Sequence, residues 1–247
     1  MGKIIAMAGK GGTGKTTIAA LIVRCIKEKK LGSVIAIDAD PNSNLAESLG
    51  IKSQFSIGEI LDSIADKVPP GMTKDRFIQH QVQTAIHEEE GFDLLIMGKP
   101  EGPGCYCYVN NVLRSVMVNL IKDYDYIVVD NEAGLEHLSR RTTRLADILI
   151  VVSDTSVVGL KSAKRIIELV KQLKFEVRKS FLLINCFNNN VGNEKIKETG
   201  LDYLGSLPHD LEIEKLSLEG KSVFELKPDA EIIKALNLLG DSIWKRN

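Results

Sequence analysis

The sequence predicts an α/β fold in which helices cover both faces of a mostly parallel, twisted sheet. Short runs of β-branched residues alternate with longer segments of helical spacing along the whole chain. Most of the short runs are continuously apolar, which is typical of strands that are covered on both faces. We find no repeat, low-complexity tract or flexible linker, so we expect residues 1–247 to form a single domain.

The predicted elements follow one another in an alternating order. Strands are expected at residues 3–8, 33–38, 93–98, 125–130, 147–153 and 180–185, with a short one at 202–206. Helices are expected at residues 15–29, 57–65, 73–88, 109–122, 156–174, 193–199 and 229–245. This alternation places the strands side by side and sends the connecting helices to the faces of the sheet.

The composition is that of a globular protein. The 247 residues include 32 Lys and Arg and 33 Asp and Glu, and 44% are apolar, which excludes a disordered polymer, a collagen-like repeat and a long coiled coil. The net charge of −1 argues against a partner held by bulk electrostatics, such as nucleic acid. No apolar run approaches the roughly 18 residues of a membrane span, and we expect no signal peptide. The sequence therefore predicts a cytoplasmic protein without a nucleic-acid or membrane partner.

A glycine-rich loop follows the first predicted strand. Residues 9–17 read GKGGTGKTT and match the pattern G-x-x-x-x-G-K-[ST] between a strand and a helix, the context of a phosphate-binding P-loop. Glycines let successive backbone N–H groups point at phosphate oxygens, and the positive end of the helix points the same way. We expect Lys15 at the β- and γ-phosphates and the Thr16 hydroxyl on Mg²⁺. The other expected phosphate-binding residues are Gly11, Gly12, Thr13, Gly14 and Thr17.

Lys10 is an additional cation within this loop. Taken alone, it is either a solvated lysine or a second phosphate contact. The loop GKGGTGKT resembles the deviant Walker A motif of the MinD/ParA/nitrogenase-iron-protein class of P-loop ATPases. The resemblance implies a single P-loop NTPase domain that hydrolyses ATP as a homodimer, in which Lys10 of each subunit reaches the nucleotide of the other.

Two aspartates follow the second predicted strand. Asp38 and Asp40 are two residues apart, so they face the same side of an extended backbone at the sheet edge where ligands bind. The alternative is an Asp-Pro turn with a polar helix cap. The pattern DADPN resembles the first switch of the same ATPase class. By that resemblance Asp40 positions or activates the attacking water and Asp38 lies near the metal.

The remaining nucleotide contacts are expected at three later strand ends. Asp130 ends an apolar strand as a Walker B aspartate does, so we expect it to hold Mg²⁺, and the Gly134 N–H is expected at the γ-phosphate. Asn185, Pro208 and Asp210 resemble the elements of the class that surround adenine. There is no Asn-Lys-x-Asp guanine signature, so ATP is favoured over GTP.

A pair of cysteines lies in the segment GPGCYC, after the third predicted strand. Cys105 and Cys107 project to one face if their backbone is extended, and a soft ion such as Zn²⁺ prefers three or four such ligands, of which one chain offers two. A second copy of the chain supplies the other two under two-fold symmetry. Cys25 has the spacing of a helix core face and Cys186 is not expected to be a ligand.

The combination of KGGTGKT, DADPN, GPGCYC and DNEAGLEHLSRRTT resembles the CooC family of nickel-insertion ATPases. The resemblance implies that a dimer binds Ni²⁺, or Zn²⁺ in its place, through both cysteine pairs. ATP hydrolysis then assists nickel insertion into carbon monoxide dehydrogenase or the related acetyl-CoA synthase. Two alternatives stay open: a positioning ATPase of the MinD/ParA type whose amphipathic 230–246 segment meets a membrane, and a carrier of a dimer-bridging Fe–S cluster.

Overall fold

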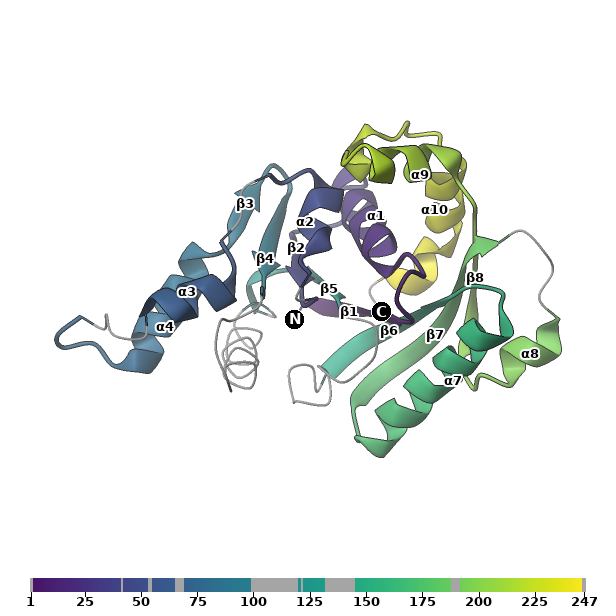
Figure 1. The fold of residues 1–247 in the computed structure, drawn as a ribbon, viewed down its shortest axis with the longest axis horizontal. Helices are drawn as coiled ribbons and strands as arrows, with labels where there is room; N and C mark the ends of the chain where they lie inside the picture. The colour runs from purple at the N-terminus through teal and green to yellow at the C-terminus, as the bar shows by residue number, and fades with distance from the viewer. Residues whose placement is uncertain are drawn as a thin grey trace.

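Strands and helices alternate along the chain in the computed structural model (Figure 1), which describes residues 2–40, 42–52, 55–64, 69–98, 120, 122–131, 145–187 and 192–245. The strands are β1 (Lys3–Gly9), β2 (Val34–Asp38), β3 (His87–Glu89), β4 (Phe92–Ile96), β5 (Tyr126–Asp130), β6 (Leu145–Ser153), β7 (Glu176–Phe187) and β8 (Asp202–Pro208). The helices are α1 (Lys15–Glu28), α2 (Asn44–Leu49), α3 (Ile57–Ile64), α4 (Lys74–Thr84), α7 (Val157–Gln172), α8 (Asn193–Lys197), α9 (Leu211–Leu218) and α10 (Glu231–Ile243), with a 3-10 turn η1 (Val223–Glu225).

The strands form one eight-stranded sheet of order β3-β4-β2-β5-β1-β6-β7-β8. All neighbouring strands run parallel except β3 and β4. Every residue of β2 and of β5 is buried, as expected for strands that are covered on both faces. The predicted α/β class with a mostly parallel sheet is therefore confirmed.

Helices cover the sheet on both faces and so make three layers (Figure 1). Alternate residues of β1 point to opposite faces: Ile5 and Met7 pack with α1, α2 and α10, whereas Ile4 and Ala6 pack on the side of α4 and α7. Within the described ranges, no helix combines the length and the apolar character that crossing a membrane requires.

The structure differs from the prediction at residues 73–88. The predicted single helix ends at Thr84, and His87–Glu89 form the edge strand β3, which pairs antiparallel with β4. Gly91, with φ +82°, turns the chain back between the two strands. The backbone N–H and C=O groups of residues 87–89 form hydrogen bonds with β4 instead of the hydrogen bonds that a longer helix would form within itself. The sequence analysis also missed α2, α9 and η1. The predicted helix at 109–122 lies almost entirely outside the described residues.

The parallel strands bring their carboxyl ends to one edge of the sheet. Asp38, the last residue of β2, lies opposite Asp130, the last residue of β5, and Met7 of β1 is the other neighbour of Asp130. Chain segments that leave these strands therefore meet at the same edge, which is where α/β folds bind ligands.

Candidate nucleotide-binding site

The P-loop joins β1 to α1, and three of its glycines, Gly9, Gly12 and Gly14, adopt conformations that other residues avoid. Gly9 has φ +148°, and a Cβ atom at this position would lie 2.3 Å from the Val152 carbonyl oxygen of β6. Gly14, with φ +86°, is the N-cap residue of α1, and a Cβ atom there would lie 2.4 Å from Nδ2 of Asn185. The loop therefore depends on glycine for both its curvature and its close packing.

Lys15 and Thr13 are buried within the loop, and Lys10 is exposed beside them. The Lys10 carbonyl oxygen accepts hydrogen bonds from Thr13 Oγ1 at 2.8 Å and from Lys15 Nζ at 3.4 Å. The Lys15 ammonium is thus held inside the curve of the loop, where it can meet phosphate oxygens. The Lys10 side chain is free to reach outward because only its backbone takes part in the loop.

Asp130 lies next to the start of α1, and only one of its two carboxylate oxygens has a hydrogen-bond partner. Its Oδ2 accepts a hydrogen bond of 2.6 Å from the Thr16 hydroxyl, whereas its buried Oδ1 has no hydrogen-bond partner. Burial raises the pKa of the Asp130 carboxyl to about 6, although the Thr16 hydroxyl and Lys15 favour the charged form. An orphaned carboxylate oxygen beside a threonine hydroxyl fits the oxygen ligands that Mg²⁺ prefers.

Asp38 is fully buried beside Asp130 and organises the loop that follows β2. Its Oδ1 accepts the Asp40 N–H at 3.1 Å and its Oδ2 accepts the Leu45 N–H at 2.9 Å. Burial and repulsion by Asp130 raise the pKa of the Asp38 carboxyl to about 7, against the two backbone hydrogen bonds. Two buried carboxyl groups this close together repel each other when charged, and a cation bound beside them relieves this repulsion.

Asp40 is half-buried and faces the cavity. Its Oδ1 accepts hydrogen bonds from the backbone N–H and the side-chain Nδ2 of Asn42, both at 2.9 Å. The turn that the sequence analysis weighed as an alternative is therefore present: the Ser43 N–H donates to the Asp40 carbonyl oxygen at 3.0 Å, and Ser43 at φ 53° is the N-cap residue of α2. The turn does not exclude the expected role of Asp40, because Asp40 also lines the cavity beside the P-loop.

A cavity of about 560 Å³ opens beside the P-loop, a size that suits a nucleotide-sized ligand. It has a glycine-rich phosphate end, a polar wall from α2 and the turn before it, and a partly apolar wall from α9 and the segment after it. Its lining residues are Gly11, Gly12, Gly14, Lys15, Thr16, Thr17, Asp40, Asn42, Asn44, Glu47, Ser48, Ile213, Leu216, Ser217, Gly220, Lys221 and Val223. Of the residues expected at the nucleotide, the lining brings together Gly11, Gly12, Gly14, Lys15, Thr16, Thr17 and Asp40, whereas Lys10, Thr13, Asp38 and Asp130 are not part of it.

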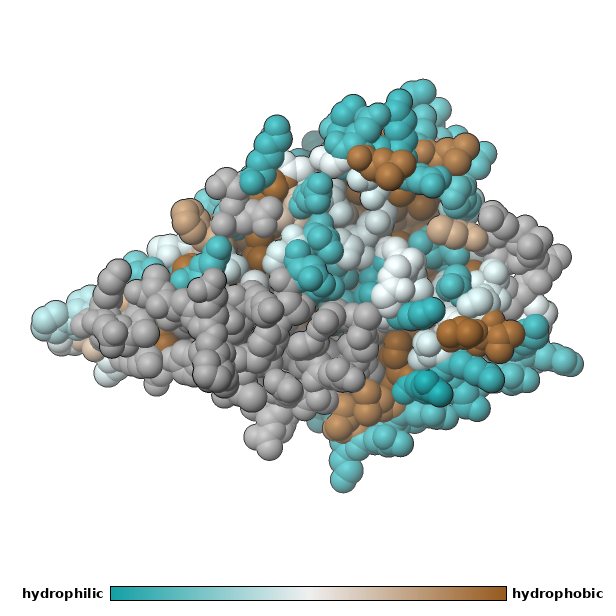
Figure 2. Space-filling view, viewed as in Figure 1, coloured by the Kyte–Doolittle hydropathy of each residue, from teal (hydrophilic) through white to brown (hydrophobic). Residues whose placement is uncertain are grey.

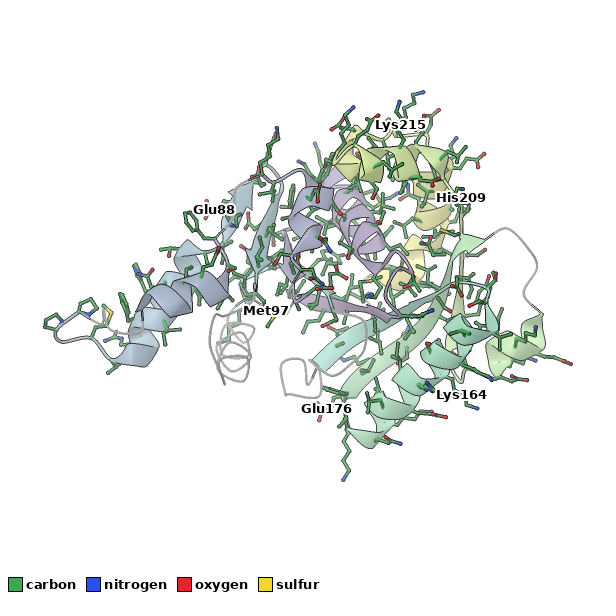
Figure 3. The ribbon with its side chains drawn as sticks, in the orientation of Figure 1. Glu88, Met97, Lys164, Glu176, His209 and Lys215 are labelled. Atoms are coloured by element: carbon green, nitrogen blue, oxygen red, sulfur yellow. The ribbon has the colours of Figure 1, made fainter. Side chains whose placement is uncertain are left out.

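Helix α9 lies over this cavity with no fully buried residue of its own. Ile213 and Leu216 line the cavity, whereas Leu211 and Leu218 are 72% and 83% exposed. Figure 2 shows apolar surface over α9, and in Figure 3 Lys215 points away from the molecule. Ile213 and Leu216, on the side of α9 that faces the cavity, are therefore only partly covered by protein and can contact a bound ligand.

The three residues expected near adenine are placed around the cavity rather than in its lining. The Asn185 amide donates from Nδ2 to the Thr13 carbonyl oxygen at 2.9 Å and so braces the P-loop. Asp210 is the N-cap residue of α9, since its Oδ1 accepts the Glu212 and Ile213 N–H groups at 2.9 and 3.3 Å. Pro208 ends β8. Asn185 and Asp210 thus hold the loop and the helix that border the cavity.

The sequence analysis missed the contributions of α2, α9 and the 220–223 segment to the cavity. Ile213, Leu216 and Val223 carry no motif, and their helical spacing alone predicts only a packed face. They become lining residues because α9 and η1 lie beside each other at the cavity, a placement that no local pattern encodes.

Gly134, Cys105 and Cys107 lie outside the described residues. Within the part of the chain that the structure describes, no group of three or more His, Cys, Asp or Glu side chains is arranged to hold a metal ion. Cys25 is buried in the core as predicted, and burial raises the pKa of its thiol to about 11. Cys186 is exposed at the end of β7.

Comparison with known proteins identifies the family of the chain. Residues 4–223 match the CobQ/CobB/MinD/ParA nucleotide binding domain. The chain belongs to this family. Its members are P-loop ATPases, so the chain is an ATP-binding ATPase.

Individual members of the family resemble the chain over nearly its whole length. It is 40% identical over 248 residues to an ATP-binding protein of Methanocaldococcus jannaschii, covering 97% of this chain and 98% of that protein. It is 29% identical over 238 residues to the carbon monoxide dehydrogenase accessory protein CooC of Rhodospirillum rubrum, covering 91% and 90%.

A solved structure shares the fold. The septum site-determining protein MinD from Pyrococcus horikoshii, complexed with Mg-ADP, superposes with a TM-score of 0.75 at 21% identity, covering 99% of this chain and 97% of that one.

Proposed function

We propose that this ATPase is a dimeric metallochaperone that binds nickel, or zinc in its place, through Cys105 and Cys107. It would assist nickel insertion into carbon monoxide dehydrogenase or the related acetyl-CoA synthase in the cytoplasm. The observation that carries the proposal is the similarity to the accessory protein CooC across 91% of the chain, together with the C-x-C pair in a P-loop ATPase.

The proposal assigns roles to the residues around the P-loop. Backbone N–H groups of the P-loop and the Lys15 ammonium bind the phosphates, and Asp40 orients the attacking water from the turn that Asn42 braces. Thr16 and Asp130 would hold Mg²⁺, with Asp38 close behind, because the orphaned Asp130 oxygen has no other partner. Bound Mg²⁺ supplies charge neutralisation at the β- and γ-phosphates.

Dimerisation links the two ligands. The exposed Lys10 side chain would cross to the nucleotide of the second subunit, as the resemblance to the deviant Walker A class implies. The same two-fold symmetry would bring four thiolates together, two from each chain, in a closed tetrahedral site. Since both ATP and the metal then favour the dimer, each should tighten the binding of the other.

The described residues give no support to the membrane-associated alternative. In α10, Ile232, Ile233, Leu236 and Ile243 are buried in the core, so the apolar face of this helix is already used. The helix therefore packs as a structural element of the domain.

The test is anaerobic metal analysis of dimer fractions. Wild-type protein loaded with Ni²⁺ or Zn²⁺ should hold one ion per two chains, and changing both Cys105 and Cys107 to Ser should remove the ion and the metal-driven dimer. Metal affinity should also fall below neutral pH, because thiolates must be deprotonated to bind. One ion per chain, or metal retained by the double variant, would contradict the shared site. A brown chromophore in the protein as purified would favour the Fe–S alternative.

A further inference from the structure

A side chain from β7 supports the P-loop from outside the loop. The Asn185 Nδ2 atom donates a hydrogen bond to the Thr13 carbonyl oxygen at 2.9 Å, across 172 positions of the chain. The amide also packs tightly against the loop, because a Cβ atom at Gly14 would lie 2.4 Å from the same nitrogen. Asn185 is not part of the cavity lining, so it contacts the loop without lining the cavity.

This hydrogen bond sets the direction of a backbone donor at the phosphate end of the cavity. The Thr13 C=O and the Gly14 N–H belong to one planar trans peptide group, in which the two bonds point in opposite directions. With the C=O held towards Asn185, the N–H points away from Asn185. Gly14 lines the cavity, and among the described residues none accepts a hydrogen bond from its N–H. Asn185 therefore fixes the direction of a donor in a loop whose N–H groups are expected to bind phosphate oxygens.

The backbone of β7 departs from regular pairing directly after this asparagine. Between two successive pairs with β8, Ile184–Ser206 and Phe187–Pro208, β7 advances by three residues and β8 by two. The extra residue is a β-bulge, a feature that redirects side chains next to functional sites. Within the bulge Cys186 has φ +53°, in the left-handed region that residues other than glycine rarely adopt. Such strained residues persist where the surrounding structure requires them, and they cluster at ligand sites.

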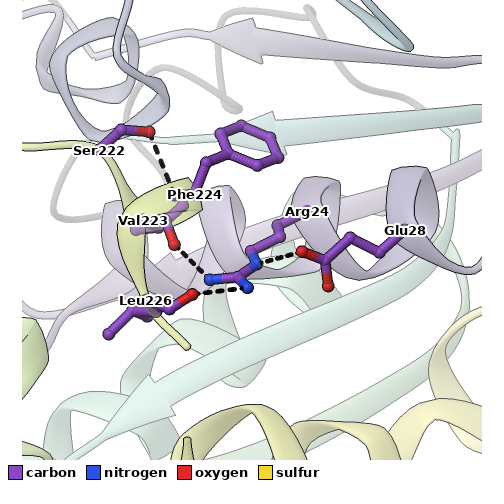
Figure 4. A network of polar contacts seen from close by, with 6 residues as sticks. All are labelled: Arg24, Glu28, Ser222, Val223, Phe224 and Leu226. Atoms are coloured by element: carbon purple, nitrogen blue, oxygen red, sulfur yellow. Dashed lines mark hydrogen bonds and ion pairs between the residues drawn. The ribbon is translucent and has the colours of Figure 1, made fainter. Parts of the chain in front are cut away.

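The helix that follows the loop is anchored separately. Arg24 of α1 is 1% exposed, and it donates to the Val223 carbonyl oxygen at 2.5 Å and to the Leu226 carbonyl oxygen at 2.9 Å (Figure 4). Its Nε donates to Glu28 at 2.7 Å. Because these contacts fix α1, the support from Asn185 acts on the loop before the helix rather than on the helix itself.

We propose that Asn185 is a positioning residue for the phosphate groups, and that the bulge at Cys186 holds its amide in place. The inference rests on phosphate binding at the P-loop. A loop whose Gly14 N–H is already directed spares the ligand the cost of ordering it, so the affinity for any polyphosphate depends on Asn185. This role differs from the adenine contact that the resemblance implies for Asn185, because it extends to a ligand that has no base.

Two probes separate the two roles. Asn185→Ala removes the donor to the Thr13 carbonyl oxygen. We expect its dissociation constant for inorganic tripolyphosphate to rise by about three- to tenfold, the loss expected for one hydrogen bond, and that for ADP to rise at least as much. A residue that contacted only adenine would leave the tripolyphosphate constant unchanged. A tripolyphosphate constant within about twofold of the wild-type value would therefore overturn the proposal.

Substitutions at Cys186 test the bulge. Cys186→Gly keeps the left-handed conformation without strain and should leave both constants within about twofold of the wild type. Cys186→Val places a β-branched residue at a positive φ, which such residues avoid, so it should weaken tripolyphosphate binding about threefold or more. In the Asn185→Ala background Cys186→Val should have no further effect, because the amide through which the bulge acts is gone. Equal behaviour of the Gly and Val variants, or additive losses in the double variant, would overturn the role of the bulge.

A matched control separates these effects from a general loss of stability. Ile233→Val on α10 removes one buried methylene and should lower stability without changing either constant. If Cys186→Val does not fold, the tripolyphosphate constant of Asn185→Ala decides. Both probes are measured first on the wild-type protein, where binding of neither would refute phosphate binding at the P-loop itself.

Discussion

Alanine substitutions at Gly12 and Gly14 form a matched pair within the P-loop. Both glycines have positive φ, +78° and +86°, so alanine strains the backbone by a similar amount at each. That strain costs roughly 1–2 kcal/mol. The surroundings differ, because a Cβ atom at Gly12 meets nothing within 4 Å, whereas one at Gly14 lies 2.4 Å from Asn185 Nδ2. The difference between the two variants therefore reports on the packing of Asn185 against the loop.

The magnitude follows from the hydrogen bond that Asn185 makes. To admit the new Cβ atom, the amide must move and lose its 2.9 Å bond to the Thr13 carbonyl oxygen. A lost hydrogen bond of this kind costs about 0.5–1.5 kcal/mol, and alanine at the N-cap of α1 adds a few tenths. We expect Gly12→Ala to lower the free energy of unfolding by about 1–2 kcal/mol, and Gly14→Ala by about 2–4 kcal/mol.

Urea unfolding of the nucleotide-free protein measures these values, and a double-mutant cycle assigns them. Once Asn185→Ala has removed the amide, Gly14→Ala should cost about 1 kcal/mol less than it does in the wild-type background. Gly12→Ala should cost the same in both backgrounds. Equal destabilisation by Gly12→Ala and Gly14→Ala, or strict additivity of Gly14→Ala with Asn185→Ala, would refute the reasoning.

Four further predictions concern the catalytic and acidic residues. Lys15→Ala should abolish nucleotide binding in calorimetry, because it removes the cation at the β- and γ-phosphates. Asp40→Asn should bind ATP but lose turnover by about a hundredfold or more, as expected when a group that orients the water is lost, and unchanged phosphate release would exclude this role. Lys10→Ala should bind nucleotide yet remain monomeric with ATP in light scattering; a wild-type shift to dimer would contradict its action across the interface. In magnesium-free buffer the protein should lose stability as pH rises from about 4 to 7, because burial raises the pKa of Asp38 from 3.8 to about 7 and the folded state binds the proton more tightly. Urea midpoints at pH 5 and 8 check this, and Asp38→Asn should flatten the slope.

The sequence alone was sufficient for the features that arise from contacts between near neighbours. The P-loop is recognisable because a glycine pattern and a helix start fall within nine consecutive residues, 9–17. Continuously apolar runs predicted strands buried on both faces, and parallel order then placed Asp38 and Asp130 at one edge. In each case the spacing of apolar residues along the chain, or a short sequence motif, is enough to predict the feature.

The tertiary structure decided the features that depend on partners far along the chain. Arg24 has the sequence context of a helix residue, and only the return of residues 223–226 over α1 makes it a buried donor to two carbonyls. Residues 87–89 are a strand where the 73–88 pattern predicted a helix, because their backbone groups form hydrogen bonds with β4. The orphaned oxygen of Asp130 likewise follows from burial and from the exact approach of Thr16. Hydrogen-bond satisfaction and burial are properties of packed surfaces, so they exist only once distant segments have met.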